Sequence, residues 1–68
     1  MIKKGIISNK EGGLAEASLP DENYTVTAML PLAKSINADE VNIGDKCAIA
    51  FFDADNVNFA DGVIIAIF

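Results

Sequence analysis

Turn-forming residues divide this chain into runs that are too short for most helices but long enough for strands. They cluster at Glu11-Gly12-Gly13, Pro20–Asn23, Ile43–Asp45, Ala54–Asn56 and Asp61-Gly62. The runs between them approach the mean strand length of about 5–6 residues. The sequence therefore predicts an all-β domain with five strands, at Ile2–Ser8, Leu14–Leu19, Tyr24–Leu30, Lys46–Phe52 and Gly62–Phe68.

The last two runs are apolar on both of their faces. In Lys46–Phe52 (KCAIAFF) and in Gly62–Phe68 (GVIIAIF), the odd-numbered and the even-numbered residues would lie on opposite faces of a strand, and both sets are apolar apart from Lys46. The β-branched residues favour pleated strands over a helix, and such strands need cover on both sides. We expect the core to contain one face of each, with two earlier residues opposite: Cys47, Ile49, Phe51, Val63, Ile65, Ile6 and Val26.

The longest connection lies between the third and fourth runs, at residues 32–42. It contains either one helical turn near residues 38–41 or a crossing loop. Five strands with their longest connection at this place predict a small five-stranded Greek-key barrel of the OB type, as a single domain over residues 1–68. An SH3-like barrel is the alternative. Closure would also remove the exposed strand edges of so apolar a chain.

This chain of 68 residues contains 51% hydrophobic residues, but a domain of this size can form only a small core, which makes it marginally stable as a monomer. Small domains usually gain additional stability from disulfides, a bound metal or a partner chain. Cys47 is the only cysteine and there is no histidine, which argues against a disulfide within the chain and a zinc site. A partner chain is the remaining source of additional stability, so we expect an oligomer. No signal peptide or membrane span is recognisable, and we expect a cytoplasmic site of synthesis.

The net charge of −5 lies in the second half of the chain. Residues 1–34 contain four lysines and four acids, whereas residues 35–68 contain one lysine and six acids. There is no arginine. This balance disfavours binding to nucleic acid, whose phosphates the second half would repel.

Three aspartates, Asp53, Asp55 and Asp61, lie between the last two runs. Counted from Asp53, an EF-hand loop fails at its fifth, sixth and twelfth positions. Asp53 and Asp55 remain weak candidates for a looser ion site, but aspartates at this place are more typical of a turn. Serines without a histidine and a cysteine within an apolar strand make no nucleophilic site. We therefore predict no enzyme activity and no cofactor.

Short motifs occur in a characteristic order along nearly the whole chain: Gly5-Ile6-Ile7, Leu19-Pro20-Asp21, Leu30-Pro31, Ile43–Phe51 (IGDKCAIAF), Asp53-Ala54-Asp55 and Gly62–Ala66 (GVIIA). This set resembles the OB-fold domain of phage tail spike and baseplate assembly proteins, the "protein V" family of contractile tails and related injection machines. The chain departs from that pattern in a longer loop before Gly62 and in Ala66, which replaces a glycine. The resemblance therefore implies a tail or baseplate OB module rather than a complete puncturing spike, in which a β-helical needle follows the barrel.

The resemblance implies a non-catalytic connector of the virion tail, assembled in the bacterial host cytoplasm. Its expected partners are two further copies of the chain, as a homotrimer, and other tail or baseplate hub proteins. We expect Phe52, Ile64 and Phe68 among the contact residues, because they lie on the apolar faces that a barrel interior cannot accommodate. The alternatives are a nucleic-acid-binding OB-fold protein and a small capsid decoration protein.

The two interpretations of the acidic loop predict different responses to calcium. If Asp55 is a turn former, Asp55→Asn leaves the melting temperature nearly unchanged, because asparagine serves the same turn role. Thermal unfolding with and without calcium measures this. A calcium-dependent rise in melting temperature that Asp55→Asn abolishes would establish an ion site instead.

Overall fold

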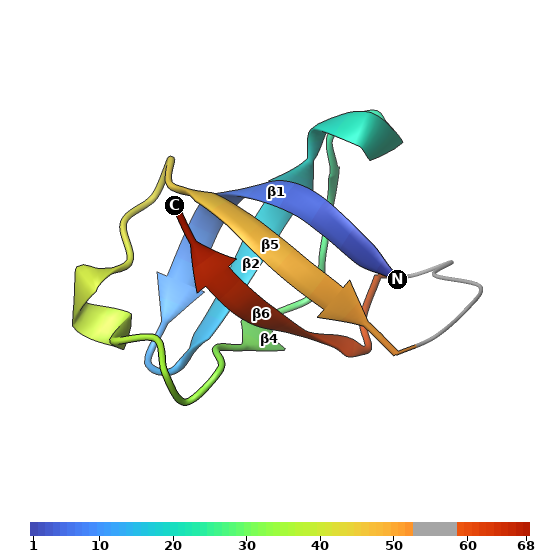
Figure 1. Cartoon of the computed structure of the whole chain (residues 1–68). Coiled ribbons are helices and arrows are strands. Elements are labelled where there is room, and N and C mark those ends of the chain that lie inside the picture. The colour runs from blue at the N-terminus through green and yellow to red at the C-terminus, as the bar shows by residue number, and fades with distance from the viewer. Residues whose placement is uncertain (53–58) are drawn as a thin grey trace.

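The computed structural model describes residues 1–52 and 59–68 (Figure 1). Two short 3-10 helices, η1 (Pro20–Glu22) and η2 (Ala38–Glu40), interrupt the strands, and the described residues contain no α-helix. The all-β prediction is confirmed, and η2 is the helical turn expected between residues 38 and 41. The strands are β1 (Ile2–Glu11), β2 (Leu14–Leu19), β3 (Thr25–Val26), β4 (Leu30–Pro31), β5 (Lys46–Phe51) and β6 (Gly62–Ile67).

One antiparallel sheet connects the strands in the order β3-β2-β1-β5-β6, and β4 also pairs with β2. The ten-residue strand β1 has two neighbours in succession. Its first half, up to Ile6, pairs with β5, and its second half, from Ile6, pairs with β2. β1 is therefore the element on which the rest of the sheet is built.

The segment that follows β4 lies between β2 and β6. The Leu32 N–H donates to the Gly13 carbonyl at 3.1 Å, and the Ala33 N–H donates to the Ile64 carbonyl at 2.8 Å. Leu32 and Ile64 also form an isolated parallel bridge. Residues 32 and 33 thus link the turn between β1 and β2 to β6, next to β4 and β6 in Figure 1.

The core is small and is built from the inner faces of the strands. Cys47, Ile49 and Phe51 are buried, as the sequence predicted. The ring of Phe51 meets that of Phe59 edge to face, with centroids 5.4 Å apart. The buried apolar residues are Ile7, Ala15, Ala17, Leu19, Leu30, Val41, Cys47, Ile49, Phe51, Phe59 and Ile64.

The predicted phase of β1 and β6 is wrong. Ile64 is fully buried opposite Ile49, whereas Val63 is half-buried and Ile65 is 38% exposed. Ile65 has no partner in β5, because the register shifts between Ile64 and Ala66 in a β-bulge. On β1 the inner residue is Ile7 rather than the half-buried Ile6.

The predicted third strand, residues 24–30, is split into β3 and β4 by Thr27. This side chain is buried, and its hydroxyl accepts from the Ala17 N–H at 3.1 Å and donates to the Ala28 carbonyl at 2.8 Å. The hydroxyl thus takes a place in the ladder that a backbone carbonyl would otherwise fill. Val26, predicted in the core, lies on the outer side and is exposed.

Two adjacent phenylalanines test the phase of β5. Phe51→Ala should lower the free energy of unfolding by about 3–5 kcal/mol, because a buried aromatic leaves a cavity. Phe52→Ala is the matched control and should change it by no more than about 0.5 kcal/mol, because Phe52 is exposed. Urea denaturation measures both, and a loss below about 1 kcal/mol for Phe51→Ala contradicts its place in the core.

Candidate interaction surface

The residues predicted to contact a partner do not all lie on the surface. Phe52 is 70% exposed and Phe68 is 66% exposed. Ile64 is 0% exposed, so it belongs to the core of its own chain and is removed from the candidate contact residues. Its position was mistaken because the inner phase of β6 was assigned to Val63 and Ile65.

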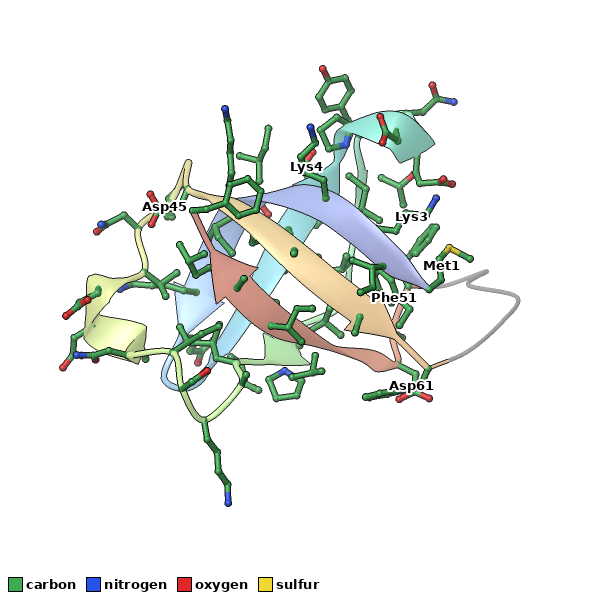
Figure 2. The ribbon with its side chains drawn as sticks, viewed as in Figure 1. Met1, Lys3, Lys4, Asp45, Phe51 and Asp61 are labelled. Atoms are coloured by element: carbon green, nitrogen blue, oxygen red, sulfur yellow. The ribbon has the colours of Figure 1, made fainter. Side chains whose placement is uncertain are left out.

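The sequence predicts no metal site and offers only weak candidates for one in the acidic loop. Asp53 and Asp55 lie outside the described residues. Asp61 is exposed at the start of β6, where its carbonyl accepts from the Phe52 N–H at 2.9 Å (Figure 2). Within residues 1–52 and 59–68, no three acidic or cysteine side chains are grouped closely enough to hold a metal ion.

Three strands present a continuous outer face. Directly paired residues of an antiparallel sheet point to the same side. The pairs Ile6–Lys46, Lys4–Ala48 and Ile2–Ala50 join β1 to β5, and Phe68 is placed next to Lys46 by the bond from its N–H to the Lys46 carbonyl. We call this surface the outer face, and it contains Ile2, Lys4, Ile6, Lys46, Ala48, Ala50, Val63, Ala66 and Phe68.

The outer face is apolar and contains no acid. Alanines occupy much of its centre beside Lys4, and Ile2 and Phe68 lie in different rows of paired residues and are both exposed. Its two charges are Lys4 and Lys46. Lys3, the neighbour of Lys4 in Figure 2, belongs to the opposite phase, and its Nζ lies 2.7 Å from Glu22 Oε2 in an ion pair. A lysine-bearing apolar face on an acidic chain is a candidate binding surface.

A groove lies at the edge of β6. This groove of about 280 Å³ is lined by Ser35, Ile36, Asn37, Glu40, Val41 and Ile67. Its two walls are the connection around η2 and the C-terminal half of β6. Ligand pockets usually measure about 300–1,000 Å³, so this groove is close to the small end of that range. The sequence interpretation missed it, because residues 32–42 were considered only as a connection.

Cys47 has no nucleophilic environment. It is fully buried in β5, and burial raises the pKa of its thiol to about 11, with a partly offsetting hydrogen bond from the Gly5 backbone. The thiolate is the reactive form of cysteine, and it is scarce here at neutral pH. Cys47 is thus a packing residue of the core.

Comparison with family models, curated proteins and solved structures finds no match to this chain. No helix in the described part of the chain is long and apolar enough to cross a membrane.

The buried thiol gives a pH-dependent prediction. Alkylation of Cys47 by iodoacetamide should be slow at pH 8, because a pKa of about 11 instead of 9.0 lowers the thiolate fraction about 100-fold. The rate should rise about tenfold per pH unit toward pH 11. The fold favours the protonated thiol, so this group stabilises it fully below about pH 9 and loses that effect as the pH rises toward 11. Equal alkylation rates for native and urea-unfolded protein at pH 8 would contradict this assignment.

Proposed function

We propose that this chain is a non-catalytic structural module of a phage or phage-like tail or baseplate. It joins copies of itself, as a homotrimer, to other tail hub proteins. The observation that carries the proposal is the outer face, a largely apolar surface that spans β1, β5 and β6, because apolar patches on small chains often mark interaction sites.

The fold that we propose is an OB-like Greek-key barrel. Its support is the sequence of pairings: β1 with β2, β2 with β4, residue 32 with β6, β6 with β5, and β5 with β1. Taken together, these pairings return to the strand from which they start. The one parallel contact, Leu32–Ile64, joins the third segment of the chain to its last strand, as expected when the fifth strand of a Greek key returns to the third.

The glycines of the tail-protein motifs have physical reasons in this fold. A Cβ on Gly5 would lie 3.1 Å from the Ala17 Cβ and 3.2 Å from the Cys47 Sγ, so a larger residue would push the strands apart. Gly44 has a φ of +98°, which side chains disfavour. Glycines thus occupy motif positions where this fold disfavours a side chain, which supports the resemblance at the level of fold. The proposed location in a phage tail rests on the order of the motifs alone.

Charge and size favour a second copy of the chain as cover for the outer face. A typical specific interface buries about 800 Å² per partner, or about a fifth of the 4083 Å² of this chain. Lys4 and Lys46 would face an acid-rich surface if the outer face of one copy meets a different face of the next. Such a head-to-tail contact closes into a ring when the rotation permits.

Two equally exposed aromatics separate assembly from folding. Phe68→Ser removes one end of the outer face and should convert a trimer into a monomer. Tyr24→Ser is the matched control, since both rings are 66% exposed but Tyr24 follows η1 and is not part of the outer face. Native mass spectrometry gives the mass of each assembly, and circular dichroism verifies that both variants are folded. Ile64→Ser is unsuitable, because it would disrupt the core.

The functional claim has its own test. Quantitative mass spectrometry of separated phage tails and heads should find the chain stoichiometric in tails, and a gel shift with single-stranded DNA at low salt should show no binding. A stable wild-type monomer at high micromolar concentration that captures no tail protein contradicts both the trimer and the connector role. Enrichment in heads would indicate a capsid decoration protein.

A further inference from the structure

The C-terminal half of β6 has a backbone edge that no other described segment pairs with. The bridge from residues 32–33 ends at Ile64, and within the described residues β6 has no other neighbour than β5 beyond this point. Unpaired edges of this kind are templates for a further strand.

The register identifies the groups that this edge presents. The Phe68 N–H donates to the Lys46 carbonyl at 2.9 Å, so this pair faces inward between the two strands. Bonded and non-bonded pairs alternate in an antiparallel ladder, so the N–H and C=O of Ile67, opposite Cys47, point away from β5. Ile64 points the same way, and its carbonyl already accepts from Ala33. Ile67 is therefore the next outward-facing residue along the edge.

The β-bulge explains why the chain's own segment stops short of Ile67. With Ile65 as an extra residue, the outward-facing positions Ile64 and Ile67 are three residues apart instead of two, and a bulged strand bends and twists more strongly. The chain meanwhile turns away after Ala33, where the Ile36 N–H donates to the Ala33 carbonyl at 2.9 Å. The space between these diverging segments is the groove of about 280 Å³.

We propose that this groove binds an extended segment of a partner protein, which adds a strand to β6 at Ile67 and inserts one apolar side chain between Ile36 and Val41. This mode combines backbone hydrogen bonds, which provide affinity, with a pocket that selects a side chain. The proposal goes beyond the tail-connector role and does not require the trimer, because the edge of β6 is distinct from the outer face.

The charge of the rim selects a basic partner. Glu40 lines the groove and Asp39 precedes it, both exposed, and no lining residue is cationic. Two lysines flank this region without lining the groove: Lys34 directly precedes Ser35, and the Nζ of Lys10 donates to the Ala38 carbonyl at 3.3 Å. A second copy of this chain fits less well, because edge-to-edge pairing about Ile67 would bring the acidic η2 segments of both copies together. Alternating apolar and basic side chains are the complementary pattern.

The test uses the folded chain and an acetylated, amidated heptapeptide in which lysine and valine alternate. Amide hydrogen exchange followed by NMR should show fast exchange of the Ile67 N–H in the free protein and at least about tenfold slower exchange with the peptide, as expected for a newly paired amide. Chemical-shift changes should map to residues 35–41 and 67. The same peptide with N-methylated valines is the matched control for charge and should leave Ile67 unprotected.

Two variants separate the backbone from the side chain. Ile67→Pro removes the outward N–H, which an edge strand tolerates, and should weaken peptide binding at least about tenfold. Ile67→Ala keeps that N–H and should weaken binding less. If Ile67→Pro does not fold, Glu40→Lys replaces it, and this variant should lose the lysine peptide and bind a valine–glutamate peptide instead.

Several results would overturn the proposal. They are equal binding of the N-methylated peptide, shifts that map to the outer face, and no binding at millimolar peptide. Slow exchange of the Ile67 N–H in the free protein at every concentration would mean that the edge is already covered. Protection that grows with protein concentration would assign the groove to a second copy.

Discussion

The close approach of three strands at Gly5 is the constraint on which the rest of this fold depends. β1 pairs with β5 in its first half and with β2 in its second, so both neighbours converge near this residue. A Cβ there would lie 3.1–3.3 Å from atoms of Ala17, Cys47 and Ile49. The core around it accordingly contains small residues. A core of so few and such small residues contributes little to the stability of the chain. Burial of the apolar outer face against a partner would therefore add to that stability.

Strand phase could be predicted from the sequence only where the two faces differ in size. In β5 the inner face has Cys47, Ile49 and Phe51 and the outer face has alanines, so the larger set was placed correctly inside. In β6 the two sets are almost equal in bulk, and the apolar pattern does not determine which is buried. Its phase is fixed instead by the pairing of Ile64 with Ile49, a long-range contact that no local pattern encodes.

The other features that the sequence did not predict also depend on contacts between residues far apart along the chain. The hydroxyl of Thr27 breaks the predicted third strand through a bond to Ala17, ten residues away, and a pattern of apolar residues contains no trace of it. The groove at the β6 edge joins Ile36 and Val41 to Ile67, so it arises only when distant segments meet. The exposure of Phe52 was predictable, because Phe52 follows the outer phase of β5. Phe68 is exposed as expected only because the bulge at Ile65 restores the predicted phase for the end of β6.

The bulge at Ile65 gives β6 two separate surfaces. Without this extra residue, Ile64 and Ile67 would be successive outward positions on a regular edge, and the segment at residues 32–33 would meet no bend beside it. With it, Ala66 and Phe68 stay on the outer face while the backbone of Ile67 diverges from its neighbour and opens the groove. In the assembly that we propose, one inserted residue would let a single strand contribute a face to one contact and an edge to another. A chain with so small a core would gain stability from both contacts, since each would bury surface that the fold alone leaves in water.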